Sequence, residues 1–325
     1  MNKTLGNIIK YTISLALAAV LVWLVVRKID WQSFAQGLKT TRWTWMIAYT
    51  IVATLALVFR ALRWNQLLKP LDPTSRFGKC WDANNIGNLG SIVIPGSCEP
   101  IRGGLTTNKN VNFQTVLGTM IMERAWDILF IFLTLVIALL SKWETFGGFV
   151  RDNILGPLSK SALFWWIFVL AIAGLVFFFR ATYRFRHKSK FLGKVADIID
   201  GVIHGFGSFV KLKNKVPYIL CSGMIWVMYM LMAYTCLKAL PELSGLDMAD
   251  ALFLSALGNI ASIIPVPGGI GAYHYLIILC LSSLYGFSNE TGLIYAMLNH
   301  EGHAILILVL GIISYIARMV KARKR

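Results

Sequence analysis

Hydrophobic positions along this chain cluster into long, nearly unbroken runs that charged residues enter only rarely. An α-helix needs about 20 apolar residues to cross the hydrocarbon core of a bilayer, so a run of that length is a candidate transmembrane helix. Six runs reach this length and predict six full transmembrane helices. They are residues 8–26, 43–62, 114–140, 161–179, 216–237 and 291–318.

Two further apolar segments, residues 80–104 and 249–285, are broken by glycine and proline. Both contain the phrase Gly-Asn-x-x-Ser-Ile, which starts at Gly87 in one and at Gly258 in the other and leads into a Pro-Gly pair. Interrupted hydrophobic segments at corresponding places in two halves of a membrane protein indicate a transporter's binding site. The phrase therefore predicts two re-entrant helical hairpins in an internal repeat. The repeated units are approximately residues 1–140 and 161–318.

Charged loops set the orientation of the predicted helices. Residues 180–215 hold nine Lys or Arg residues and residues 318–325 hold five, whereas residues 238–250 hold three acidic residues and one basic residue. Because positively charged loops stay in the cytoplasm, we expect cytoplasmic N- and C-termini and two halves that are inverted in the membrane. The basic loop at residues 27–42 runs against this rule, since this topology places it outside.

Composition agrees with this pattern: 57% of the residues are hydrophobic, 14% are charged, and the mean hydropathy is +0.64. We therefore expect an all-α polytopic membrane protein that forms a single transmembrane domain over residues 1–325. Most of the net charge of +17 lies beside hydrophobic spans, where it meets anionic lipid, so no nucleic-acid partner is expected. The five cysteines are scattered and predict neither a disulfide framework nor a zinc site.

Residues 189–212 carry apolar positions at helical spacing with lysines at both ends, which predicts an amphipathic helix. Such a helix lies on the cytoplasmic leaflet or packs against the helical bundle. The pattern fits both positions.

Three ionisable residues, Glu123, Arg124 and Asp127, lie about nine residues inside the predicted span 114–140, near the bilayer midplane. Glu123 and Asp127 share a helix face, and Arg124 is placed to pair with Asp127 three residues later. Charges at this depth are costly. They indicate either an internal ion pair that joins helices or a role in substrate binding or proton coupling.

The last span carries His300, Glu301 and His303 at a similar depth. Their order resembles a metalloprotease helix motif, but that motif has its histidines four residues apart, and no third ligand with suitable spacing is evident. We therefore expect no metal and no other cofactor. The cluster suits proton handling, and hydrogen bonding between helices is the structural alternative.

The hairpins carry further candidate residues. Beyond the first Pro-Gly break, Arg102 and the free N–H groups of a restarted helix would bind an anion such as a lipid phosphate, with Glu99 holding the arginine in place. In the second hairpin, Gly268 and Gly269 let the backbone approach a ligand, and His274 is the only ionisable group. A purely structural turn is the alternative for both hairpins.

Arg60 and Arg63 stand near the end of the second predicted span. Anchoring in the headgroup region by long, outward-reaching side chains is favoured over phosphate capture for both residues.

Five short motifs stand between residues 60 and 271, and the resemblance that they carry covers nearly the whole chain: Arg60-x-x-Arg63-Trp64, Gly87-Asn88, Pro95-Gly96-x-x-Glu99-x-x-Arg102, Glu123-Arg124-x-x-Asp127 and Pro267-Gly268-Gly269-x-Gly271. Together they resemble the flippase-like family that shares the lysylphosphatidylglycerol synthase transmembrane region. The resemblance implies a polytopic protein of the bacterial cytoplasmic (inner) membrane that moves or presents lipids, among them aminoacylated phosphatidylglycerol and polyprenyl-linked or other glycolipids. In the family a glutamate commonly follows the second hairpin, where this chain has Tyr273-His274. The aminoacyl transferase of the synthases is a separate soluble domain, which is not expected here.

We therefore expect a lipid transporter or flippase that moves or presents an anionic lipid, phospho- or polyprenyl-phosphate-linked, and that is not an enzyme. The alternatives are a membrane enzyme that modifies a lipid headgroup and a scaffold that presents lipid to a separate glycosyl- or acyltransferase. The expected substrate-binding residues are Arg60, Arg63, Asn88, Glu99, Arg102, Arg124, Asn259, Gly268, Gly269 and His274. The expected coupling or midplane polar residues are Glu123, Asp127, His300, Glu301 and His303.

Overall fold

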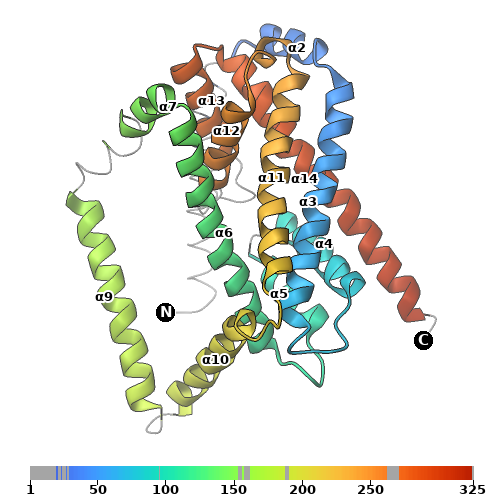
Figure 1. Cartoon of the computed structure of the whole chain (residues 1–325), viewed down its shortest axis with the longest axis vertical. Helices are drawn as coiled ribbons and strands as arrows, with labels where there is room; N and C mark the ends of the chain where they lie inside the picture. The colour runs from blue at the N-terminus through green and yellow to red at the C-terminus, as the bar shows by residue number, and fades with distance from the viewer. Residues whose placement is uncertain are drawn as a thin grey trace.

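The computed structural model of the chain is helical throughout the residues that it describes, which contain no strand. Those residues are 20, 23, 27, 29–94, 96–152, 156, 162–186, 190–261 and 271–323. Figure 1 shows the helices as one bundle from which α9 stands apart.

Four helices of the described chain are long and apolar enough to cross a membrane. They confirm, by length and composition, the helices predicted at 43–62, 114–140, 216–237 and 291–318. These helices are α3 (Trp43–Leu68), α6 (Phe113–Ser141), α11 (Val216–Ala239) and α14 (Asn289–Arg323). Many of their large apolar side chains are exposed on the surface of the bundle. Exposed apolar side chains of this kind are typical of a surface that faces lipid and unusual on a surface that faces water.

The other two predicted spans have different outcomes. Residues 161–179 fall on α9 (Ala162–Phe185), a helix of 24 residues whose role as a span stays a prediction. Residues 8–26 lie almost wholly outside the described residues.

Both predicted broken segments contain two short helices. The first holds α4 (Phe77–Val93) and α5 (Cys98–Thr106), which meet at a turn where Gly96 has a φ of 80°, a conformation that favours glycine. The second holds α12 (Met248–Ala261) and α13 (Ala272–Tyr285), and the residues between them, with Gly268 and Gly269, lie outside the described part. The first pair lies in the lower half of Figure 1 and the second in the upper half. Their entry from opposite membrane faces stays a prediction.

Shorter helices close the two ends of the bundle. The amphipathic segment predicted at 189–212 forms α10 (Lys190–Phe206) and a 3-10 turn, and α10 packs against the start of α6, where Gly201 meets Gln114. Packing on the bundle is therefore what the structure shows, and contact with the cytoplasmic leaflet stays a prediction. The remaining elements are α2 (Trp31–Lys39), α7 (Trp143–Val150), the turn η2 (Gly207–Phe209) and the turn η3 (Pro241–Leu243).

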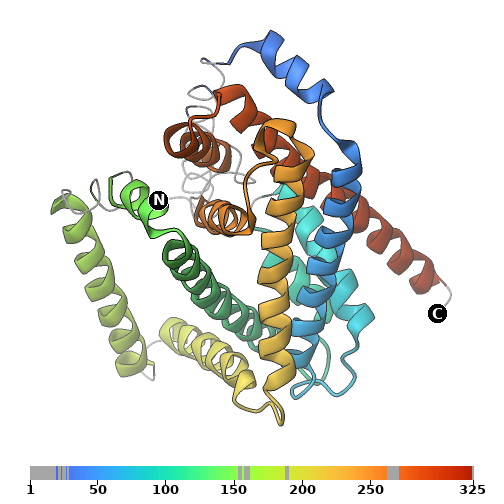
Figure 2. The same ribbon diagram turned by 45° about the horizontal axis from the view of Figure 1, so that its top comes forward.

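Helices from the two predicted repeat units, residues 1–140 and 161–318, contact each other in a reciprocal way. α3 runs along α11, as Figures 1 and 2 both show. α14 packs on α4, and α6 packs on α12, so the last long helix of each predicted repeat unit contacts the first short helix in the broken segment of the other unit. On α14, Gly311 admits Leu89 of α4, and Asn85 of α4 donates to the Ser314 hydroxyl at 3.2 Å.

The repeated glycine has the same local task in both halves. A Cβ on Gly87 would lie 2.8 Å from Cγ of Arg102 on α5, and a Cβ on Gly258 would lie 2.5 Å from the Tyr273 ring on α13. Glycine therefore lets the second helix of each broken segment approach the first. The repeated phrase thus encodes close helix packing.

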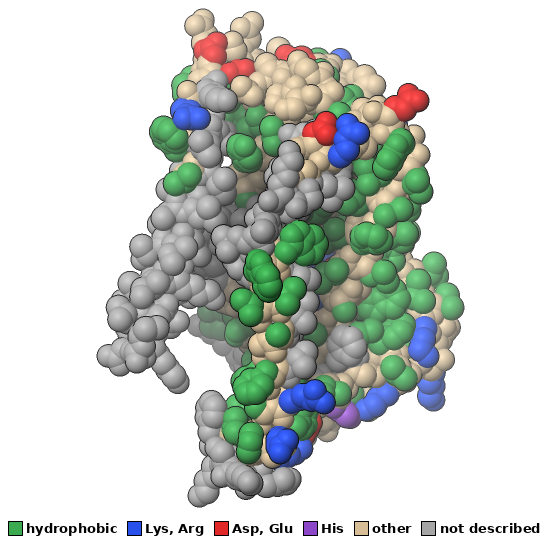
Figure 3. Space-filling model, turned by 90° about the vertical axis from the view of Figure 1, so that its left-hand side faces the viewer, with side chains coloured by type: hydrophobic (Ala, Val, Ile, Leu, Met, Phe, Trp, Pro, Cys, Tyr) green, Lys and Arg blue, Asp and Glu red, His purple; other side chains and the backbone are tan. Residues whose placement is uncertain are grey.

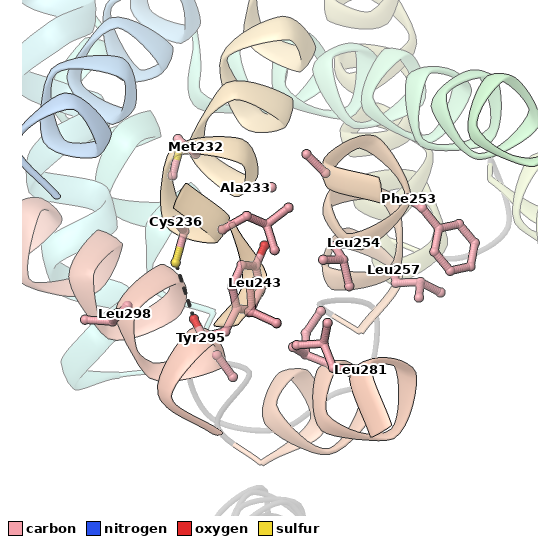
Figure 4. Close-up of a cluster of buried hydrophobic side chains, with 14 of the residues drawn as sticks. Met232, Ala233, Cys236, Leu243, Phe253, Leu254, Leu257, Leu281, Tyr295 and Leu298 are labelled. Atoms are coloured by element: carbon pink, nitrogen blue, oxygen red, sulfur yellow. Dashed lines mark hydrogen bonds between the residues drawn. The ribbon is translucent and has the colours of Figure 1, made fainter. Parts of the chain in front are cut away.

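The largest apolar core of the described residues lies mainly among α11, α12, α13 and α14, and α3, α6 and α7 add side chains to it (Figure 4). Met232, Leu254 and Leu281 all belong to this core, and the Cys236 thiol donates to the Tyr295 carbonyl oxygen at 3.6 Å. In Figure 3 the acidic side chains on the visible face gather at the upper end and most of the basic ones at the lower end.

Candidate functional site

A cavity of about 410 Å³ lies where α3, α6, α11, α12, α13 and α14 meet. Its charged lining residues are Arg60, Arg124 and Asp127, and polar side chains from Asn259, Asn299 and His303 extend the lining. Ile131, Trp226 and Met232 supply apolar wall. A cavity with mixed walls and convergent polar groups is the usual form of a small-ligand site.

Below the cavity wall, a buried ion-pair network joins three helices. Arg63 of α3 donates to Asp127 of α6 at 2.7 Å, and its Nε lies 3.7 Å from Glu123. Glu123 in turn accepts from Arg102 of α5 at 2.6 Å. The Arg63 side chain is 1% exposed, so it does not anchor in the headgroup region as the sequence favoured. Arg63 is instead buried inside the bundle, between the carboxylates of Glu123 and Asp127.

Arg102 is buried among protein side chains, whereas the sequence predicted an accessible position suited to an anion site. Its side chain is 4% exposed and stacks over the Trp64 ring, with 4.0 Å between Cζ and the ring centroid. Trp64 is itself fixed, since its indole N–H donates to the Thr119 hydroxyl at 3.0 Å. Arg102 is absent from the described cavity lining. A cation stacked on an aromatic face and paired with a carboxylate has little capacity left for a ligand.

Glu99 pairs with Arg124 and not, as the sequence suggested, with Arg102. The Arg124 guanidinium lies 3.0 Å from Glu99 and 3.9 Å from Asp127. The predicted pair within α6, Arg124 with Asp127, is therefore the longer contact, because Arg63 occupies the other side of Asp127. With a side chain that is 53% exposed, Arg124 remains accessible on the cavity wall.

Arg60 is a cation of the cavity wall that does not take part in the ion-pair network. Arg63, Arg102 and Arg124 balance the three carboxylates of Glu99, Glu123 and Asp127, so these six charges cancel. Arg60 takes part in no ion pair among the described residues and donates instead to the Tyr229 hydroxyl at 3.3 Å. Of the charged side chains that line the cavity in the described part of the chain, Arg60 therefore carries a positive charge without a carboxylate at ion-pair distance.

A second polar group stands on the α13 and α14 side of the cavity. Glu301 contacts two imidazoles, with 2.9 Å to Nδ1 of His300 and 3.1 Å to Nε2 of His274. His303 lines the cavity, and its Nε2 is buried without a hydrogen-bond partner among the described residues. The expected cluster of His300, Glu301 and His303 is thus joined by His274 from another helix.

The asparagines of the repeated phrase differ in position. Asn259 lines the cavity and donates to the Ser255 carbonyl oxygen at 2.8 Å. Asn88 lies on α4, accepts from the Cys98 thiol at 3.5 Å and does not appear in the cavity lining of the described chain.

Two further cavity residues, Tyr229 and Asn299, are absent from the expected site residues. Tyr229 holds Arg60, and the Asn299 carbonyl oxygen accepts a hydrogen bond from Tyr49. A polar group in the middle of an apolar span was the available signal for both residues.

A sequence model of the family described as lysylphosphatidylglycerol synthase TM region matches residues 11–311 of the chain. Comparisons with curated proteins and with solved structures gave no match.

Proposed function

This chain belongs to the lysylphosphatidylglycerol synthase TM region family, and we propose that it binds the anionic headgroup of a membrane lipid in its cavity and moves that lipid across the bilayer. Membership and the long apolar helices make it a multi-pass membrane protein related to lipid modification or flipping. The choice of lipid transport, and of an anionic lipid, is our proposal. A bacterial cytoplasmic membrane with both termini inside is part of it.

The observation that carries the proposal is the unbalanced charge of Arg60. A guanidinium without a carboxylate partner, facing a cavity between hydrophobic helices, strongly favours an anionic occupant. Arg124 stands on the same wall and can supply a second set of donors. The planar fork of arginine fits the oxygens of a phosphate, and apolar wall residues such as Trp226 suit the glycerol or acyl portion beside it.

The arrangement of the halves supports movement as well as binding. Lining residues come from α3 and α6 of the first half and from α11 to α14 of the second, so the cavity lies at the boundary of the proposed repeat. Inverted repeats that enclose a site near the midplane open it to one side at a time when one half rocks against the other. The reciprocal covering of α4 by α14 and of α12 by α6 is what two halves related in this way would make.

The test uses the full chain reconstituted in phosphatidylcholine vesicles that carry a trace of fluorescent phosphatidylglycerol or fluorescent phosphatidylcholine. A membrane-impermeant quencher reports how fast the labelled headgroup changes leaflet. We expect faster movement of phosphatidylglycerol, and Arg60→Gln should slow it at least tenfold. Arg151→Gln is the matched control, because Arg151 is 77% exposed and pairs only locally with Asp152.

A binding measurement separates transport from presentation. Phosphatidylglycerol added to the detergent-solubilised chain should raise its thermal unfolding midpoint, and Arg60→Gln should remove that rise. Binding without movement would favour a scaffold that presents lipid to a separate transferase. Equal rates for both lipids, or a wild-type rate in Arg60→Gln, would contradict the anionic-headgroup proposal.

A further inference from the structure

The lipid proposal leaves one cluster of side chains beside the cavity unused: His274 of α13 with His300 and Glu301 of α14. We propose that these three residues bind a divalent transition-metal ion, for which Zn²⁺ has the best-matched chemistry. The proposal stands apart from lipid transport, because it rests on a different set of side chains.

The distances suit a metal ion with small adjustments. The three ligand atoms all lie within 4.8 Å of one another, with Glu301 oxygens 3.1 Å from His274 Nε2 and 2.9 Å from His300 Nδ1. Zinc bonds to nitrogen and oxygen are about 2.0–2.2 Å long, so neighbouring ligands of a tetrahedral ion stand about 3.4 Å apart. Each imidazole nitrogen already lies near this separation from one of the two Glu301 oxygens, and no two of the ligand atoms are more than 4.8 Å apart.

The donor set selects the class of ion. Two imidazole nitrogens and one carboxylate oxygen favour Zn²⁺ and related transition metals, whereas Mg²⁺ and Ca²⁺ prefer oxygen ligands. Three protein ligands leave a coordination position open, as in catalytic zinc sites. Since His300 lines the cavity, water or an oxyanion in the cavity is the available further ligand. A divalent ion carries two positive charges and the Glu301 carboxylate carries one negative charge. The occupied site would therefore have a net positive charge.

Packing holds the cluster between two helices. His274 is 7% exposed, its ring centroid is 5.5 Å from that of His300, and the Tyr273 ring lies 5.1 Å from His300 on another side. α13 and α14 approach closely where Gly292 meets the backbone of Ile278. The ligands therefore belong to packed helices, which favours a fixed geometry.

The sequence hid this site because its ligands are not spaced as a helix motif. His300 and His303 are the histidine pair that the spacing brings to notice, but His303 is outside the cluster of three. The second imidazole comes from His274, which lies 26 residues before His300 in the chain.

The test measures metal binding to the full chain, purified through a tag without histidines and stripped with a chelator. Titration with Zn²⁺ alone, followed by calorimetry and elemental content, should give one ion per chain. His274→Ala, His300→Ala and Glu301→Gln should each weaken binding at least tenfold. His204→Ala is the matched control, because His204 lies on α10 away from the cluster and should leave binding unchanged.

A second measurement, on the wild-type chain, tests metal binding even if a variant folds poorly. Co²⁺ added to the stripped wild-type chain should give the visible absorption of a four-coordinate site, and Zn²⁺ should remove it. Zn²⁺ should also raise the thermal midpoint of wild type and not that of Glu301→Gln. The proposal would be overturned if wild type bound no more Zn²⁺ than the three single variants do. The three side chains would then form an ion-paired imidazole cluster only.

Discussion

Arg63 Nη1 lies 2.7 Å from Asp127 Oδ1, and this contact joins α3 to α6 through a guanidinium that is 1% exposed. The two residues are 64 positions apart in the chain. A buried charge depends on its partner, because removing one member leaves the other without compensation in a low-dielectric interior. The pair therefore contributes to the bundle's stability and to the shape of the cavity wall that Asp127 lines.

Replacing Arg63 by leucine should lower stability by about 3–5 kcal/mol, the usual cost of breaking a buried pair from one side. The double change Arg63→Leu with Asp127→Leu should recover part of this loss, because no orphaned carboxylate remains. Unfolding of each variant in a detergent titration measures the difference, with the exposed pair variant Arg151→Leu as control. A double variant as unstable as the sum of the two single variants would show that the residues are not coupled.

Arg102→Lys should destabilise the protein by about 1–2 kcal/mol, because lysine keeps the charge and loses the planar stacking on Trp64. Lipid movement per folded molecule should remain close to wild type, since Arg102 is buried away from the cavity lining. Thermal unfolding and the vesicle assay give the two readouts. A large loss of transport at unchanged stability would return Arg102 to the headgroup site.

The repeated glycine gives a prediction with an internal control. Gly258→Ala should cost about 1–3 kcal/mol, because the added methyl would stand 2.5 Å from the Tyr273 ring. Gly223→Ala on α11 should instead be neutral or stabilise by up to about 1 kcal/mol, since no heavy atom lies within 4 Å and alanine favours the helix. Thermal midpoints of the two variants should move in opposite directions or differ clearly. Equal midpoints would mean that α12 and α13 do not need the glycine.

The loop that follows α3 contains Asp72, and we expect this residue to make the free energy of unfolding fall as the pH is lowered into the acid range. Burial raises the pKa of Asp72, but hydrogen bonds from Thr74, Asn108 and Asn110 outweigh it and lower the pKa from 3.8 to about 2. Because the folded pKa lies below the unfolded one, this stabilisation is present above pH 4 and is lost as the pH falls toward 2. The shift corresponds to about 2 kcal/mol.

Asp72→Asn should therefore be less stable than wild type by about this amount at pH 7, and the difference should shrink between pH 4 and pH 2. Thermal midpoints of both proteins across this range measure the effect. A difference that stays constant with pH would assign the contribution of Asp72 to something other than its charge.

The helices were predictable because their signal is local. Run length fixed α3, α6, α11 and α14, and the glycine and proline break fixed the interruption between α4 and α5. The packing position of α10 was not predictable, because an apolar face gives no information on whether lipid or protein covers it.

The polar residues of the site were found by their cost in a membrane, but their partners were not. Local spacing suggested that Asp127 pairs with Arg124, whereas Arg63 from another helix is closer. Spacing likewise left His274 apart from His300. Such partners depend on how helices pack over long sequence distances, which a short motif does not encode.

The covering of α4 by α14 has a consequence for biosynthesis. Asn85 and Ser314, which bond across this contact, are separated by 229 positions, so α4 leaves the ribosome long before the helix that shields it. During synthesis the face of α4 that carries Asn85 and Leu89 is therefore made before α14, whose Gly311 and Ser314 cover it in the folded chain. Packing of α4 in its final environment therefore depends on a helix whose Ser314 is synthesised 229 residues after Asn85.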